Sequence, residues 1–205
     1  MIRSKRLLKK GAESELYLTD WYGQTAVSKI RVSKKYRHYS IDLILRKYRT
    51  LHEASIMSSV KMFGVETPFI YFLDSNNFEI IMEYVVGNVL KDIFSPKYCI
   101  ELGEIIAKLH FNNIIHGDIT TSNFIMTPQN RLVVIDFGLS FFSERFEDKA
   151  ADIRLFKEIL NSVHVDFFKP SFENFLLGYS KICGKKSSKI FNTVNEIERR
   201  GRYSR

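Results

Sequence analysis

Three polar residues in one stretch of the chain have the types and the order that phosphoryl transfer needs. Asn123 follows Asp118 by five positions, and Asp136 comes after an intervening apolar segment. The reaction needs one carboxylate that orients or deprotonates the acceptor, and hard oxygen ligands for Mg²⁺. Asp118 is therefore the candidate catalytic base, and Asn123 and Asp136 are the candidate metal ligands. Asp and Asn also favour turns and caps, so the hypothesis depends on the ordered set and not on any one residue.

A β-hairpin is predicted between the two candidate metal ligands. Residues 124–126 and 132–135 are apolar and suit two short strands, while residues 127–130 are turn formers. Such a hairpin would return Asp136 to the side of Asn123. The order of Asp, Asn, hairpin and Asp-Phe-Gly resembles the catalytic region of the protein-kinase fold.

Two residues nearer the N-terminus fit the same chemistry. Residues 25–31 predict a strand in which Lys29 follows Ala-Val-Ser, similar to the kinase strand whose lysine holds the α- and β-phosphates. A helix is predicted from residues 40–42 to about residue 61, with Gly64 as its stop. Glu53 lies within that helix and is the candidate partner that would aim Lys29. A strand lysine and a helix glutamate are also common on plain surfaces.

The predicted helix has an apolar face and a basic face. The spacing of apolar side chains assigns the buried face to the following residues: Leu43, Ile44, Tyr48, Leu51, Ser55 and Met62. Arg46, Lys47 and Arg49 are expected mostly outside.

Further ATP contacts are expected at two backbone segments. A phosphate-covering loop with a single glycine is predicted at Gly11, Ala12 and Glu13, before a strand beginning near Leu16. Residues 70–73 and 79–85 predict a second hairpin, which would end in a hinge that binds adenine. The residues expected there are Met82, as the gatekeeper, with Glu83 and Val85.

The remaining sequence predicts helices and a basic end. Helices are expected over residues 95–112, 149–162, 171–183 and 187–198, followed by an extended tail, 199–205. The resulting fold class is α+β: one bilobal kinase-like domain over residues 1–205, with a sheet-plus-helix lobe (1–86) and a mainly helical lobe (87–198).

The composition is that of a globular protein with two basic segments. The chain has 205 residues, 45% of them hydrophobic, and a formal charge of +8. Residues 29–49 carry a net +7 and residues 181–205 a net +6, so the remainder is acidic. Such segments suit a nucleic-acid or acidic-protein contact, or a solvated lysine-rich surface. Without an export signal or a membrane span, the expected location is the cytoplasm, with the two cysteines reduced.

Four motifs resemble one family, the small atypical kinase and ATPase of the KEOPS complex, which serves threonylcarbamoyladenosine formation on tRNA. They are HGDITTSN from His116, KIR-x₃-KYRH from Lys29, RT-x₂-EA from Arg49 and KAADI from Lys149. The resemblance covers nearly the whole chain. It implies ATP and Mg²⁺ as cofactors, serine/threonine kinase and ATPase activity, and tRNA contact through the complex. It also implies two protein partners: the KEOPS catalytic subunit, a threonylcarbamoyltransferase, and a small regulatory subunit.

The same resemblance implies roles for individual residues. Asp118 is then the base, Lys29 and Glu53 an ion pair, and Asn123 and Asp136 the Mg²⁺ ligands. Asp152 looks like the buried helix aspartate that braces the catalytic loop. The basic C-terminus would reach toward the catalytic subunit or tRNA through these arginines: Arg199, Arg200, Arg202 and Arg205.

Departures from an ordinary protein kinase leave two rival functions open. Gly117 replaces the arginine that would pair with a phosphorylated activation loop, and Thr120 replaces the lysine that commonly neutralises the transferring phosphate. Conventional regulation by loop phosphorylation is therefore not expected. One rival is a small-molecule phosphotransferase of the aminoglycoside or choline kinase type, against which the short helical lobe argues. The other is a nucleotide-gated scaffold without turnover, against which the complete polar set argues.

Overall fold

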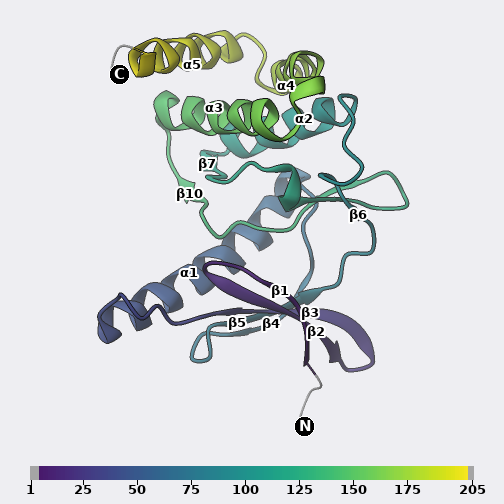
Figure 1. Cartoon of the computed structure of the whole chain (residues 1–205), viewed down its shortest axis with the longest axis vertical. Helices are drawn as coiled ribbons and strands as arrows, with labels where there is room; N and C mark the ends of the chain where they lie inside the picture. Colours follow the sequence, from purple (N-terminus) through teal and green to yellow (C-terminus); the bar gives the residue numbers. More distant parts are fainter. Residues whose placement is uncertain (1–4, 203–205) are drawn as a thin grey trace.

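The N-terminal half is a five-stranded antiparallel sheet with one long helix against it, as a computed structural model of the chain shows (Figure 1). The structure describes residues 5–202, and side chains up to residue 200. The strands are β1 (Lys5–Lys10), β2 (Ser14–Trp21), β3 (Gln24–Arg31), β4 (Ile70–Asp74) and β5 (Glu79–Glu83), in the spatial order β1-β2-β3-β5-β4. β1 was not predicted, because all six of its residues are exposed and it has no buried face.

Helix α1 (Tyr39–Val60) passes into a short 3₁₀ turn, η1 (Lys61–Phe63), and ends at Gly64 with φ +68°. A left-handed backbone at that point favours glycine, as the sequence predicts. The predicted apolar face is wrong. Ile44, Tyr48, Leu51, Ser55 and Met62 are exposed and Leu43 is half-buried.

The buried face of α1 contains two carboxylates among its apolar residues: Asp42, Thr50, Glu53, Ala54, Ile56, Met57 and Val60. Asp42 accepts a bond from Arg46 Nε at 2.7 Å, and Arg49 bonds Glu13 at 2.9 Å. Both arginines are partly buried, although they were expected outside. The spacing of apolar residues does not identify this buried face, because the face includes charged residues. Such residues can be buried when they are paired with opposite charges.

The C-terminal half is helical: α2 (Tyr98–Phe111), α3 (Phe146–Val163), α4 (Phe168–Cys183) and α5 (Lys186–Arg202), with a 3₁₀ turn η3 (Val165–Phe167). Helices α2 and α4 cross closely at Gly103 and Gly178. A Cβ on either glycine would clash with a backbone carbonyl of the other helix. Three helices begin at residues other than those predicted. α2 starts at Tyr98 rather than near Ser95, and α3 and α4 begin three residues earlier than predicted.

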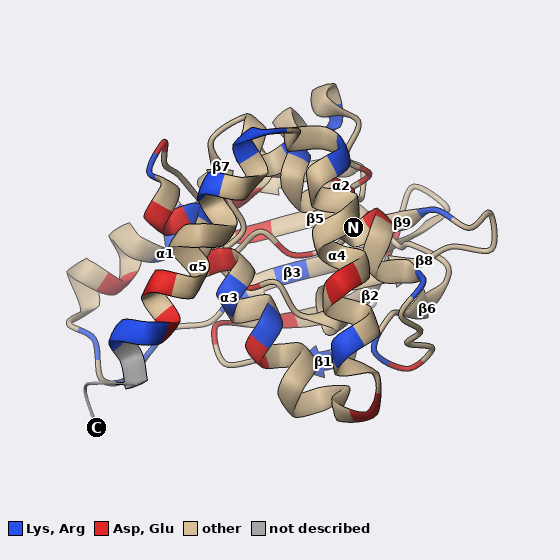
Figure 2. Cartoon of the chain, turned by 90° about the horizontal axis from the view of Figure 1, so that it is seen from above, with Lys and Arg blue, Asp and Glu red and all other residues tan. Residues whose placement is uncertain are grey.

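The expected extended tail is also wrong in part. Helix α5 continues through Arg202 and lies against α3 at the top of Figure 1, where Lys157 Nζ bonds Glu198 Oε1 at 2.7 Å. Both basic and acidic residues are visible along α3 and α5 in Figure 2. Arg199 and Arg200 are therefore presented by a helix end, and Arg205 lies outside the described residues.

Short strands join the two halves. β6 (Asn88–Val89), β8 (Phe124–Met126) and β9 (Leu132–Val134) form one small sheet, and β7 (Ile114–Ile115) pairs with β10 (Phe141–Phe142). One hydrophobic cluster runs from the α1 side through β5 into α2 and α3. This shared core fixes the short strands, and with them the polar residues at their ends.

Two further features of the described residues concern the helices and the cysteines. None of the described helices has the length and apolar character needed to span a membrane. Cys99 and Cys183 are both free thiols. Burial raises the pKa of Cys99 to about 12, so this thiol is protonated at neutral pH.

Candidate functional site

Two adjoining cavities lie between the sheet and the helical half. The larger, about 410 Å³, is lined by apolar residues of β2, β3 and β5 together with the predicted hinge, including Leu16, Val27, Met82, Glu83 and Val85. The smaller, about 200 Å³, is called the polar chamber. It is lined by the loop after β1 and by charged residues from other segments: Gly11, Ala12, Glu13, Lys29, Asp118 and Asp136. Lys29 and Asp136 line both. The larger cavity is called the apolar chamber. An apolar chamber next to a polar one suits a ligand with a flat ring and an anionic tail.

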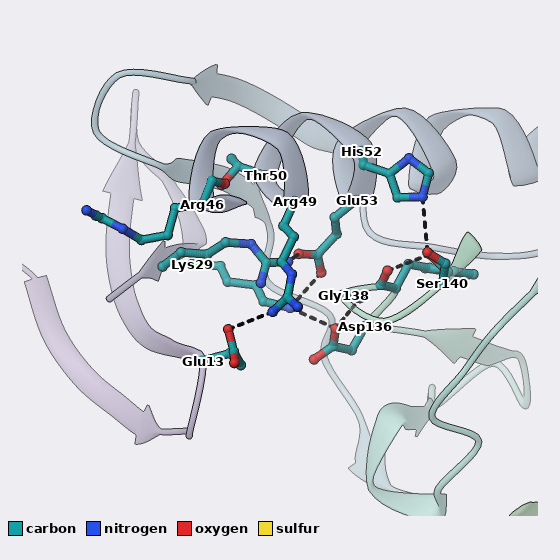
Figure 3. A network of polar contacts seen from close by, with 12 residues as sticks. Glu13, Lys29, Arg46, Arg49, Thr50, His52, Glu53, Asp136, Gly138 and Ser140 are labelled. Atoms are coloured by element: carbon teal, nitrogen blue, oxygen red, sulfur yellow. Dashed lines mark hydrogen bonds and ion pairs between the residues drawn. The ribbon is translucent and has the colours of Figure 1, made fainter. Parts of the chain in front are cut away.

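In the polar chamber, Lys29 contacts two carboxylates from other parts of the chain (Figure 3). Its Nζ donates to Glu53 Oε1 at 2.6 Å and to Asp136 Oδ1 at 2.8 Å. Strand β3 supplies the lysine, α1 the glutamate and the loop after β9 the aspartate. Residues 24 and 107 positions away thus converge on one ammonium group.

The electrostatics of this group keep Lys29 and Asp136 charged. Burial alone would lower the pKa of Lys29, but the carboxylates of Glu53 and Asp136 outweigh it and raise that pKa. Burial would likewise raise the pKa of Asp136, but Lys29 and the amide of Gly138 hold it far below its usual range. Asp136 is therefore an anion at neutral pH, as a metal ligand must be.

Asp118 and Asn123 face each other within the loop of residues 116–123, which is called the catalytic loop. Asn123 Nδ2 donates to both the backbone oxygen and Oδ2 of Asp118, each at 2.9 Å. These bonds fix the carboxylate in the lining of the polar chamber. They also leave Asn123 Oδ1 uncommitted by either bond, so the amide can offer its oxygen to a cation.

The predicted hairpin positions Asp136 next to Asn123. β8 pairs with β9, and Ile135 N donates to Asn123 O at 3.0 Å, so that the residue after Ile135 emerges beside Asn123. The second strand is one residue shorter than predicted. An ionised carboxylate and an amide oxygen at the edge of a cavity are hard oxygen donors of the kind that Mg²⁺ takes. The residues present therefore fit a magnesium ion held jointly with ligand phosphates.

Asp152 on α3 braces the catalytic loop from behind. Its Oδ2 accepts from His116 N at 2.8 Å and from His110 Nε2 at 3.1 Å, and its Oδ1 accepts from Gly117 N at 2.9 Å. Burial would raise the pKa of Asp152, but His110, His116 and the loop amides lower it. His110 in turn contacts Tyr179 OH through Nδ1 at 2.8 Å. A chain of buried bonds thus joins α2, α3 and α4 to the loop.

Gly117 occupies a position that few other residues could take. Its φ is +78°, and a Cβ built on it would collide with the carbonyl oxygen of Leu139. A left-handed backbone conformation costs a side-chain-bearing residue free energy. The close approach adds a steric reason, since the catalytic loop contacts the segment after Asp136 at this glycine.

Acid should destabilise this loop through His116. The ring is buried, and its Nδ1 accepts from Asp118 N at 3.3 Å, while its Nε2 has no hydrogen-bond partner among the described residues. Burial lowers the pKa of His116, against the opposing effect of Asp152, Asp136 and Asp118. Protonation would also remove the acceptor that the Asp118 amide uses.

The sign of the resulting pH effect follows from proton counting. An unfolded histidine has a pKa near 6.5, and the pKa of His116 in the folded chain is lower. Just below pH 6.5 the unfolded chain therefore binds more protons than the folded chain. The free energy of unfolding should therefore fall as the pH drops from 7.5 to 5.5, by on the order of 1 kcal/mol from this group. Urea unfolding at both pH values measures it. His116→Gln should flatten the pH dependence, and a variant whose dependence overlays wild type would exclude His116 as its source.

The contacts of two residues, Glu13 and Arg31, were missed by sequence reasoning. Glu13 was expected only as a loop residue, yet its carboxylate bonds Arg37 at 3.1 Å and Arg49 at 2.9 Å, which fastens the loop to α1. Its pKa is lowered, because these cations outweigh partial burial. Arg31 is buried and bonds Glu53, a contact that the sequence analysis does not predict. Its position two residues after Lys29, on the same face of a strand, was the available signal.

Not all of the predicted site residues meet in the cavities. The candidate base, the two candidate metal ligands, Lys29, the loop residues and the hinge residues line them. Glu53 lies behind Lys29, and Asp152 behind the catalytic loop. Arg199 and Arg200 line neither cavity, and their predicted contact would be with another molecule.

The comparisons with known proteins identify the family of the chain. The protein kinase domain family matches residues 10–154. A KEOPS complex subunit Bud32 from Pyrococcus abyssi is 40% identical over 212 residues, covering 97% of this chain and 96% of that protein. A probable bifunctional tRNA threonylcarbamoyladenosine biosynthesis protein from Methanobrevibacter smithii is 43% identical over 198 residues. The chain spans 37% of that longer relative.

A solved structure supports the fold independently. The Rio2 kinase from Chaetomium thermophilum, crystallised as an ADP/Mg²⁺-phosphoaspartate complex, superposes with a TM-score of 0.65 over 99% of this chain and 72% of that one. Its sequence identity is 17%, so this likeness concerns the fold alone.

Proposed function

The chain belongs to the protein kinase domain family and, within it, to the Bud32 subunits of the KEOPS complex, and from this premise we propose what its site does. The protein binds ATP with Mg²⁺ and turns it over as an atypical serine/threonine kinase and ATPase. Its work serves threonylcarbamoyladenosine formation on tRNA, in the cytoplasm.

One observation carries the proposal: five polar residues from separate parts of the chain meet around the two adjoining cavities. Four of them, Lys29, Asp118, Asn123 and Asp136, line the cavities, and Glu53 supports Lys29 from behind. Lys29, aimed by Glu53, would hold the α- and β-phosphates. Asn123 and Asp136 would hold the Mg²⁺, which screens the phosphate charge when bound. Asp118 would accept the proton of the attacking hydroxyl or water. The apolar chamber at Met82, Glu83 and Val85 would take the adenine.

The proposed partners are the threonylcarbamoyltransferase of the complex and a small regulatory subunit, with tRNA contacted through the assembly. The C-terminal arginines would meet an acidic surface of the first partner or of tRNA. Helix α5 gives them a firm base, since Lys157 ties Glu198 to α3. Arg199 and Arg200 follow directly on that anchored turn.

Turnover of ATP by the purified protein tests this function. Phosphate release should be slow for the isolated chain and should rise when tRNA and the threonylcarbamoyltransferase are added together. Chelating Mg²⁺ should abolish it in every mixture, because the metal neutralises charge that the protein alone does not. Absence of Mg²⁺-dependent ATP binding, with or without the partners, would refute the proposed function.

A further inference from the structure

The carboxylate of Glu53 is shared by two cations. Lys29 bonds Oε1 at 2.6 Å, and Arg31 Nη2 bonds Oε2 at 2.5 Å. All three side chains are almost fully buried. A single lysine would satisfy the aiming role described above, so the second cation needs its own explanation.

Arg31 belongs to the polar chamber and not merely to the sheet. It lines that cavity together with Asp118 and Asp136. A Cβ built on Gly138 would lie 3.2 Å from Arg31 Nη2, so the guanidinium packs against the residue that follows Asp136-Phe137. Arg31, the last residue of β3, thus contacts both α1 and the segment that contains Asp136, the predicted metal ligand.

Charge accounting shows what Arg31 supplies. Without nucleotide, Lys29 is divided between Glu53 and Asp136. In the proposed complex, Lys29 would hold the phosphates and Asp136 would hold the Mg²⁺, so Lys29 would be shared with a further anion. Glu53 would then be a buried carboxylate with a weakened partner, which is costly. Arg31 has no such competing task, and its bond to Glu53 can persist through the cycle.

Stability alone explains Arg31 poorly. Its Nε is buried without a hydrogen-bond partner among the described residues. A buried ion pair often contributes little net stability compared with apolar side chains of similar volume. An unsatisfied buried donor reduces that contribution further.

We propose that Arg31 is a positioning residue, the constant partner of Glu53 that keeps α1 docked and Lys29 aimed while nucleotide is turned over. The inference rests on the proposed function. It gives α1 an internal anchor in a chain that has glycine, Gly117, where ordinary kinases carry the arginine that reads loop phosphorylation. Arg31 acts through Glu53 and does not itself bind the transferred phosphate.

A double-mutant cycle between Arg31 and Glu53 tests the proposal. Arg31→Gln should lower kcat by about tenfold or more in the wild-type background, and by less than about twofold in the Glu53→Gln background, because both changes remove the same support. Arg31→Lys keeps the charge and should recover most of the lost kcat. Arg131→Gln is the matched control, since Arg131 pairs with Glu66 on the exposed surface, and it should leave kcat unchanged.

The outcomes separate the alternatives. Equal losses from Arg31→Gln in both backgrounds would mean that Arg31 acts independently of Glu53, which overturns the proposal. So would wild-type turnover in Arg31→Gln. If that variant loses its cooperative unfolding transition, Arg31→Met, which keeps the aliphatic volume, replaces it in both backgrounds with the same expectations. A wild-type protein that binds no Mg²⁺·ADP would refute the proposed function itself, and the role of Arg31 with it.

Discussion

Asp118→Ala should reduce ATP turnover by about a hundredfold or more while nucleotide affinity stays within about threefold of wild type, because a general base contributes to the transition state and little to ground-state binding. The carboxylate is held by Asn123 Nδ2 and lines the polar chamber, whereas Asp118 is not among the residues that line the apolar chamber, where adenine is proposed to bind. Steady-state phosphate release, together with a direct measurement of Mg²⁺·ADP binding, separates the two quantities.

A matched control for this variant is Asp166→Ala, which removes an exposed aspartate in η3. It should leave both turnover and affinity unchanged. Turnover of Asp118→Ala within about threefold of wild type would contradict the assignment of Asp118 as the base. A large loss of nucleotide affinity in that variant would instead indicate a role in binding.

Asp136→Asn should weaken binding of Mg²⁺·ATP by at least tenfold, or about 1.4 kcal/mol. The substitution replaces an anionic oxygen ligand by a neutral amide at a hard cation. It also removes the charge that Lys29 contacts at 2.8 Å. Affinity should therefore fall most at saturating Mg²⁺ and much less when the nucleotide is offered with a chelator.

A magnesium titration of nucleotide affinity makes this distinction. Wild type and Asp166→Asn should both gain affinity as Mg²⁺ rises, and Asp136→Asn should gain little. Parallel curves for wild type and Asp136→Asn would remove Asp136 from the metal site. Asn123 and the nucleotide phosphates would then have to hold the ion without it.

The catalytic region was the part of the fold that local sequence predicts best. Turn formers at residues 127–130 between two apolar runs fix a hairpin, and Asn130 adopts φ +56° at its end. The hairpin in turn brings Asp136 to Asn123. The signals are short-range, so each is visible in a window of a few residues.

The placement of α1 and α5 required long-range information. Asp42 and Glu53 are buried because Arg46, Lys29 and Arg31 neutralise them, and two of those cations come from another element. A hydrophobic period cannot register such pairs. Helix α5 likewise continues into arginines that read as a tail, because Glu198 is fastened to α3. Arg31 was missed because its partner, Glu53, is remote in the sequence.

The backbone of Gly117 has a consequence for how this chain could change over evolution. No single substitution could give it a phosphate-sensing arginine at that position, because any side chain would meet the carbonyl of Leu139 and would have to adopt φ +78°. Control by a phosphorylated loop would need the loop and the segment after Asp136 to be rebuilt together. Intermediates with only one of those changes would lose the fit between the two segments. A phosphorylation switch at this position would therefore require at least two coordinated changes, one at Gly117 and one in the segment that contains Leu139.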